Sequence, residues 1–177
     1  HKSISSRINE LMEKMDLICG RSSKFTNLSK APIAYRQARE AARLGAEFQP
    51  NAHKLPVPFN WSRIFSFDRV QVAFIADKVG DDLPLLNSTY ASVIVRSIAE
   101  DDAERGTDNY LFLYDYLMCE RRANIVAEKL HMHRNNVKYR IDRIESMYGI
   151  DTSDPSLRFA FLLAYRFRNA EIMQNAQ

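Results

Sequence analysis

Amide, aromatic and cationic side chains are concentrated in one stretch of the sequence, HMHRNNVKYRIDRIESMYGI at residues 131–150. Asparagine can both donate to and accept from the major-groove edge of adenine, and tyrosine can contact a thymine methyl group or a phosphate. Lysine and arginine can reach guanine or the DNA backbone. An ordinary solvated helix would more often carry pairs of glutamate and lysine. The chemistry that this stretch favours is therefore recognition of double-stranded DNA.

The spacing of the apolar residues predicts that this stretch is an amphipathic helix. Val137, Ile141, Ile144 and Tyr148 recur at intervals of four, three and four residues, so a helix places them on one face that a core can bury. The polar side chains then lie on the opposite face and its flanks. We predict base contacts from Asn135, Asn136, Lys138 and Tyr139, and phosphate contacts from His131, His133, Arg134, Arg140 and Arg143. For Arg140 the alternative is an ion pair with a neighbouring acid.

Residues 123–142 fit the template of a helix-turn-helix, in which two short helices are joined by a tight turn and the second has polar N-terminal residues. Ala127 is small where the two helices would cross, and the apolar contacts between them are expected from Val126, Leu130, Met132 and Val137. His131 occupies the turn position that is often glycine, so we expect either a different turn or a strained residue. Many helical hairpins that do not bind DNA would match this template too.

Composition indicates a soluble protein of one domain or two small ones, because 46% of the 177 residues are hydrophobic and 27% are charged. No apolar run approaches the roughly 20 residues that span a bilayer, and the first 30 residues lack the order of a secretory signal. We therefore expect a cytoplasmic protein with no membrane partner. Cys19 and Cys119 form neither a CxxC pair nor a disulfide framework, so both are expected to be reduced.

The net charge of +3 is unevenly distributed along the chain. Residues 1–80 contain 13 Lys and Arg against 7 Asp and Glu, residues 81–120 contain 2 against 9, and residues 121–177 contain 10 against 6. An acidic middle followed by a basic end suggests that the last segment meets a polyanion. A chance distribution of surface charge is the alternative.

The elements that would position this segment are mostly helices. Apolar periodicity and end signals predict helices at 2–15, 30–45, 68–80, 84–104, 108–120, 122–130, 133–149 and 154–170. Short strands are expected at 16–20 and 63–67, and the proline-rich residues 49–61 are the best linker candidate. Gly45 is expected to stop the second helix, Asp68 to cap the third, and Asp154 and Pro155 to begin the last. The N-terminal helix, strand and helix form an incomplete α/β unit whose partner strands are expected upstream.

A resemblance to a known family sharpens these expectations. The residues ANIVAEKLHMHRNNVKYRIDRIESMYGIDTSDP are similar to the C-terminal helix-turn-helix of the PucR/CdaR family of bacterial transcriptional regulators, which includes the sugar-diacid regulators. The residues that carry the resemblance are Ala127, Leu130, His133, Arg134, Asn135, Tyr139, Arg140, Gly149, Asp154 and Pro155, preceded by Leu113, Tyr116 and Leu117. Asn136 stands where the family usually has threonine, on the side expected to face DNA. The family also usually has threonine near Phe112, which lies in a helix that is expected to pack in the core.

The N-terminal 48 residues resemble, more weakly, the tail of the degenerate GGDEF-like domain that precedes this motif in many members, through ICGRSSKF and AYRQAREAARLG. The resemblance implies a folded remnant without cyclase activity, because no GGDEF sequence is present. The predicted fold is mainly α, with a truncated α/β (GGDEF-like) remnant at 1–48, a connecting region at 49–105 and a helix-turn-helix domain at 106–177. The resemblance also implies that an effector is sensed by a region absent from this chain. It further implies that the protein binds DNA and controls a metabolic or catabolic operon.

Two other classes of function are weighed against DNA binding. No His, Cys or acidic residues combine into a triad or metal-ligand spacing, and His131 and His133 form a lone HxH, so we expect no catalytic residues, no metal and no cofactor. A helical interaction or dimerisation module without autonomous DNA binding is the second alternative, since LRFAFLLAYRFR is apolar nearly all round. A homodimer or higher oligomer suits either function, with contacts expected through the helices at 80–120 or upstream.

Overall fold

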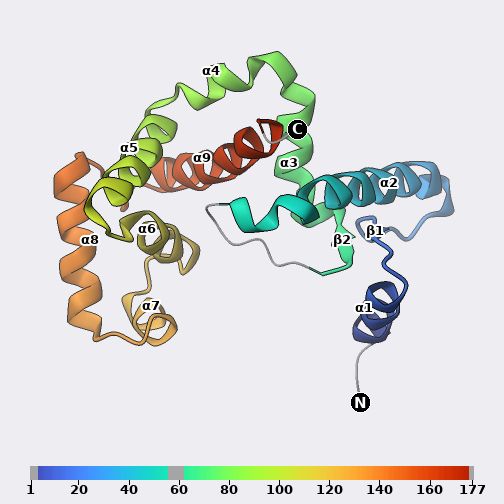
Figure 1. Cartoon of the computed structure of the whole chain (residues 1–177), viewed down its shortest axis with the longest axis horizontal. Coiled ribbons are helices and arrows are strands. Elements are labelled where there is room, and N and C mark those ends of the chain that lie inside the picture. The colour runs from blue at the N-terminus through green and yellow to red at the C-terminus, as the bar shows by residue number, and fades with distance from the viewer. Residues whose placement is uncertain (1–3, 56–61, 176–177) are drawn as a thin grey trace. The chain divides into compact units, whose positions relative to one another are not determined.

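The computed structural model describes residues 4–55 and 62–175, and helices account for most of them (Figure 1). This confirms the mainly helical fold class that the periodicity predicts. The chain forms two compact units, residues 1–80 with 169–177, and residues 81–168. Among the described residues, no helix combines the length and apolar character needed to cross a membrane.

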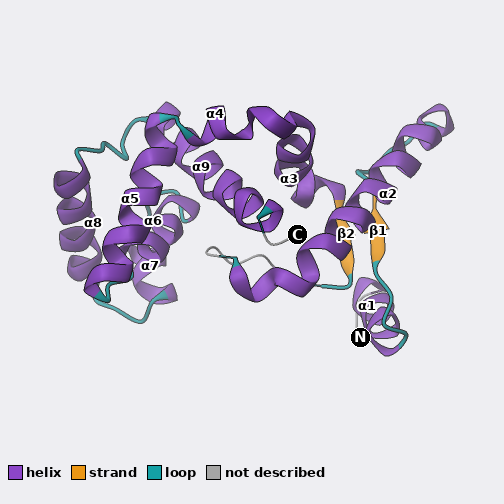
Figure 2. Cartoon of the chain, turned by 45° about the horizontal axis from the view of Figure 1, so that its top comes forward, coloured by secondary structure: helices purple, strands orange, loops and turns teal. Residues whose placement is uncertain are grey.

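The first unit contains a small sheet of two parallel strands, β1 (Cys19–Arg21) and β2 (Ile64–Ser66), which pair with Cys19 opposite Ile64 (Figure 2). Helix α2 (Ala31–Phe48) lies between them in the chain and contacts both, and helix α1 (Ile4–Lys14) precedes them. The expectation that β1 has its partner upstream is wrong for the described residues, because its partner β2 follows it. Strand β1 also begins later than predicted.

Helix α2 does not stop at Gly45 but continues to Phe48, and a 3-10 helix, Gln49–Lys54, follows directly. Gly45 serves close packing instead, since a Cβ atom there would lie 2.3 Å from Cδ2 of Phe65, whose side chain is buried. The prediction of a helix stop was wrong because a buried aromatic ring from β2, not the helix end, requires the glycine. The 3-10 helix occupies the start of the expected linker, and residues 56–61 lie outside the described residues.

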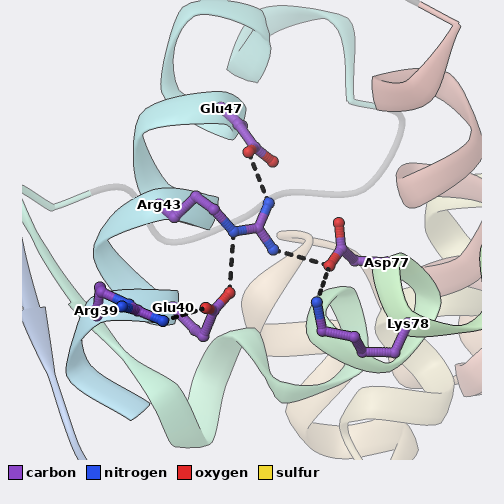
Figure 3. Close-up of polar contacts among 6 residues, drawn as sticks. All are labelled: Arg39, Glu40, Arg43, Glu47, Asp77 and Lys78. Atoms are coloured by element: carbon purple, nitrogen blue, oxygen red, sulfur yellow. Dashed lines mark hydrogen bonds and ion pairs between the residues drawn. The ribbon is translucent and has the colours of Figure 1, made fainter. Parts of the chain in front are cut away.

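The core of the first unit is apolar and is formed by Ala41, Leu44, Phe48, Phe65, Val70 and Met173. Beside it, the Arg43 guanidinium on α2 donates to Glu40 at 2.9 Å, to Glu47 at 2.7 Å and to Asp77 of α3 (Phe67–Val79) at 2.8 Å (Figure 3). Partial burial opposes the charge of Arg43, but the hydrogen bonds to these carboxylates outweigh it and raise the pKa of Arg43. The pKa of Asp77 is lowered because Lys78 and Arg43 outweigh its partial burial.

Two predicted helix boundaries were wrong. Ser66 occupies the N-cap position of α3, whereas Asp68 lies in its first turn and accepts a hydrogen bond from the Ser23 hydroxyl. The helix expected at 84–104 is split into α4 (Leu83–Asn87) and α5 (Tyr90–Arg105). The Ser88 hydroxyl donates to the carbonyl of Leu85 at 2.7 Å, a local bond that competes with continuation of the helix.

The second unit holds α4, α5 and then α6 (Asn109–Met118), α7 (Ala123–Lys129) and α8 (Arg134–Tyr148), with α9 (Pro155–Gln174) beginning in it. The side chain of Asp154 accepts from the N–H groups of Ser156 at 2.7 Å and Leu157 at 3.3 Å, which confirms the predicted cap, and Pro155 is the first helical residue. On α9, Phe161 and Tyr165 are fully buried while Phe159 is exposed. In this grouping α5 lies with the helix-turn-helix and α3 with the sheet.

Candidate nucleic-acid interface

Helices α7 and α8 contact each other in the second unit (Figure 1). Val126 on α7 and Val137 on α8 are fully buried, and Ala127 is 9% exposed. Leu130 and Met132, in the turn between the helices, are half-buried. The structure thus buries the apolar residues that the sequence assigned to this crossing, and it leaves the other face of α8 free of the core.

The turn between the two helices is closed by backbone hydrogen bonds and contains a residue in the left-handed region. The N–H of Leu130 donates to the carbonyl of Val126, and that of Met132 to Ala127, both at 2.9 Å. His131 has φ +52°, a conformation that costs a non-glycine residue about 1–2 kcal/mol. Of the two possibilities for this position, the strained residue is confirmed.

His133 caps the N-terminus of α8. Its backbone is extended, with φ −73° and ψ 141°, and its Nδ1 accepts a hydrogen bond from the N–H of Asn135 at 3.2 Å. An N-cap acceptor satisfies one of the four N–H groups that a helix start leaves unpaired. Because Nδ1 is used in this way, only Nε2 of His133 is available for a phosphate.

Eight of the nine predicted contact residues are exposed, on α8 and in the turn that precedes it. Asn135, Asn136, Lys138 and Arg143 are exposed, and Tyr139 is 71% exposed despite its aromatic ring. The exposed set also includes His131, His133 and Arg134. We call these eight residues the polar face of the helix-turn-helix. All eight are therefore accessible to a partner.

The opposite side of α8 is buried, as the periodicity predicts. Val137, Ile141 and Ile144 are at most 4% exposed. Tyr148 completes the stripe and is half-buried, with its hydroxyl donating to Asp101 on α5 at 2.7 Å. Burial and this hydrogen bond to a carboxylate raise the pKa of Tyr148. The core therefore sets which side of α8 faces outward.

Arg140 differs from the other predicted phosphate contacts because its side chain is only 23% exposed. Its Nη2 forms an ion pair with Asp108, and its Nε and Nη2 donate to Oδ1 of Asn109 at 3.3 and 3.2 Å. Its Cζ lies 4.3 Å from the ring centroid of Phe112 on α6. These contacts correspond to the alternative interpretation of Arg140, an ion pair with a neighbouring acid.

The end of α8 is fixed by a set of contacts that the sequence analysis missed. Gly149 adopts the left-handed conformation, and the N–H of Ile150 donates to the carbonyl of Glu145 at 3.0 Å. The carboxylate of Glu145 accepts from the N–H of Thr152 at 3.0 Å and from its hydroxyl, and Thr152 is fully buried. Tyr90 donates to the Gly149 carbonyl at 3.1 Å. The glycine was a recognisable C-terminal signal, but nothing in the residue types marked the threonine.

Comparison with known families finds a match, and it lies in this part of the chain. Residues 112–167 match the PucR C-terminal helix-turn-helix domain. The match runs from α6 through α7 and α8 into α9, so it covers the polar face and the contacts of Arg140 with Phe112. The PucR-type helix-turn-helix predicted from the sequence is confirmed, and it supports a DNA-binding transcriptional regulator. The curated proteins and the solved structures yielded no significant match to the chain.

The first unit also contains a cavity of about 160 Å³. It is lined by Leu44, Glu47, Phe48, Ala73, Asp77, Ala170 and Met173. Both of its carboxylates already form ion pairs, Glu47 with Arg43 and Asp77 with Arg43 and Lys78. Across the described residues, no three His, Cys, Asp or Glu side chains gather in a way that would hold a metal ion.

Proposed function

We propose that this protein is a sequence-specific transcriptional regulator of the PucR type that inserts α8 into the major groove of DNA. The observation that carries the proposal is the polar face, which lies on a helix-turn-helix that matches the PucR domain. Asn135, Asn136, Lys138 and Tyr139 contact base edges, because amide and phenol groups near the start of a recognition helix are placed to do so. Control of a metabolic or catabolic operon, in the cytoplasm of a bacterium, is part of this proposal.

The phosphate contacts in this proposal come from the residues around the base-contacting group. Arg134 and Arg143 are exposed, and their guanidinium groups suit paired hydrogen bonds to phosphate oxygens. His131 and Nε2 of His133 lie at the turn, where the backbone of DNA would pass a recognition helix. Such contacts fix the register of the protein on DNA but do not select a sequence.

The proposal is tested by DNA selection. The purified chain is incubated with sheared genomic DNA of its source organism at moderate and at high salt, and the retained fragments are sequenced. A regulator recovers a few promoter fragments and loses them as salt rises, because phosphate contacts release counterions. Recovery of no fragment above background at either salt would refute autonomous, sequence-specific binding.

Two matched variants separate base contact from phosphate contact. Asn135→Ala is expected to cost about 1–3 kcal/mol on the preferred site and to relax discrimination there. Arg143→Ala is expected to weaken preferred and random sequences alike. Equal losses on both kinds of DNA for Asn135→Ala would contradict its assignment to base contact.

A helical interaction module is the second candidate function. It is favoured by the apolar side chains exposed on the second unit, where Phe159 is 65%, Tyr90 51% and Val93 49% exposed. Sedimentation of the whole chain, with Phe159→Asp as the matched variant, tests whether such residues support self-association. A homodimer also suits DNA binding, because it presents two recognition helices to half-sites about one turn of DNA apart.

Further parts of the proposal concern the rest of the chain. We propose that residues 1–48 are the tail of a degenerate GGDEF-like domain, and the parallel strands joined through α2 support an α/β origin. We also propose that the protein is not an enzyme and that its effector binds outside this chain. A binding screen in which the chain alone recognises a small metabolite would contradict the last point.

A further inference from the structure

The Arg140 side chain is held on three sides by residues at the start of α6. The ion pair with Asp108 uses Nη2, the contact with Asn109 uses Nε and Nη2, and the Phe112 ring lies against the face of the guanidinium. Phe112 is itself 1% exposed, so the surface that supports Arg140 is part of the core. A planar group with donors on adjacent edges is needed to make all three contacts together.

The position of Arg140 on α8 gives these contacts a mechanical consequence. Successive residues of a helix are 100° apart, so Arg140 lies on a flank between the buried stripe and the polar face, one turn after Asn136. The core stripe of Val137, Ile141 and Ile144 holds α8 from one direction only. A second attachment on the flank fixes the rotation of α8 about its own axis, and this rotation sets where Asn136 and Tyr139 point.

We propose that Arg140 is a positioning residue, which holds the recognition helix against the start of α6 and makes no contact with DNA. This inference rests on the proposed function, since it concerns how the polar face is presented. It replaces the phosphate contact that residue type alone predicts for Arg140. The ion pair with Asp108 accordingly belongs to the DNA-binding machinery, although Asp108 carries the same charge as DNA.

The salt dependence of DNA binding distinguishes the two roles. The probe is the duplex that the wild-type chain retains most strongly, with a random duplex of equal length beside it. Arg140→Met is expected to lower affinity for the preferred duplex about two- to 150-fold, the range of coupling between contacting residues. Its slope of log affinity against log salt stays at the wild-type value. The exposed control Arg143→Met makes this negative slope less steep by about 0.9, the contribution of one phosphate contact.

For two conservative variants, the positioning role and a phosphate contact predict opposite changes in DNA affinity. Arg140→Lys keeps the charge but cannot make the three contacts, so it stays as defective as Arg140→Met, whereas it would rescue a phosphate contact. Asp108→Asn removes a negative charge that repels DNA, yet it is expected to weaken preferred binding. A phosphate-contacting Arg140, once released from Asp108, would instead bind DNA more tightly. Asp108 is 73% exposed, so its substitution is compatible with folding, and circular dichroism confirms the helix content of each variant.

The outcomes separate this inference from the proposed function. A wild-type chain that selects no DNA overturns both. A wild-type chain that binds specifically, together with a salt slope lowered by Arg140→Met or tighter binding by Asp108→Asn, overturns the positioning role alone. An unchanged slope with weakened preferred binding in all three variants establishes it.

Discussion

Replacing Thr152 with valine tests whether the end of α8 depends on one buried hydrogen bond. Thr152 is fully buried after α8, and both its N–H and its hydroxyl donate to the Glu145 carboxylate. Valine has nearly the same shape, so Thr152→Val removes the hydroxyl donor without opening a cavity. The N–H bond to Glu145 remains, and the carboxylate loses one of its two donors.

The expected loss follows from the charge of the acceptor. Hydrogen bonds to charged groups contribute about 1.5–3 kcal/mol to the free energy of unfolding, so Thr152→Val should cost about that much. For a unit of the size of residues 81–168, this corresponds to a fall in melting temperature of roughly 6–24 °C. Thr152→Ser keeps the donor and loses only a methyl group, so its cost should be about 1 kcal/mol.

The assay is thermal and urea unfolding followed by circular dichroism for the wild type, Thr152→Val and Thr152→Ser. Glu145→Gln, which keeps an acceptor without the charge, should cost about as much as Thr152→Val, because it weakens both hydrogen bonds from Thr152 and charge-assisted hydrogen bonds are roughly twice as strong as neutral ones. A Thr152→Val variant within about 0.5 kcal/mol of the wild type would refute the reasoning, since surface substitutions have effects of that size. A serine variant less stable than the valine variant would show that the methyl group, not the hydroxyl, is what matters.

Three further outcomes are expected. Gly45→Ala should lower the free energy of unfolding by about 1–3 kcal/mol in urea unfolding, because its Cβ atom would meet the buried Phe65 ring, and unchanged stability would contradict this packing. Gly149→Ala should lower the free energy of unfolding by about 1 kcal/mol, measured by thermal melting. The cause is the φ of +64° alone, because nothing lies within 4 Å of the added Cβ atom, and Gly149→Asn should cost less. Asp77→Asn should flatten the acid branch of the stability curve. The folded-state pKa of Asp77 is lowered, so its ion pair with Arg43 stabilises the fold above the unfolded value of about 3.9 and is lost as pH falls through the folded pKa. Because both side chains are about one-third exposed, the effect should stay below about 1 kcal/mol, and equal acid sensitivity of the variant and the wild type would argue against it.

The helix-turn-helix was predictable because its signals are local. The interval between Val137, Ile141 and Ile144 depends only on the geometry of one helix, and a buried stripe of that spacing leaves the other side exposed wherever the helix packs. Asp154 and Pro155 likewise act within one turn of the helix that they begin. Such features need no knowledge of the rest of the chain.

The features that sequence analysis placed wrongly depend on distant partners. Gly45 has the residue type of a helix stop, but it lies under Phe65, which follows twenty residues later in another element. Asp68 has the type of a cap, but it accepts a hydrogen bond from Ser23, forty-five residues earlier. Residue type states what a side chain can do, whereas tertiary packing decides which of those contacts it makes.

The charge distribution shows the same limit at the level of the DNA-binding surface. The acidic segment at 81–120 does not simply present its charge to solvent, because several of its carboxylates bind partners within the second unit. These are Asp101 with Tyr148, Asp102 with Thr107 and the N–H of Tyr110, Asp108 with Arg140, and Asp115 with Lys129. Three of the ten Lys and Arg residues in the basic segment at 121–177 therefore pair with carboxylates of the acidic segment, Lys129 and Arg140 as above and Arg122 with Glu120.

The net charge of neither the acidic segment nor the basic segment therefore gives the surface charge that DNA would encounter. The carboxylate of Asp108 cancels the charge of Arg140, and that of Asp115 cancels the charge of Lys129, so each pair adds no net charge to the surface. The cations that remain on the polar face are Arg134, Lys138 and Arg143. Because each phosphate contact contributes about 0.9 to the salt slope, the slope of this protein should follow these exposed cations rather than the net charge of the segment.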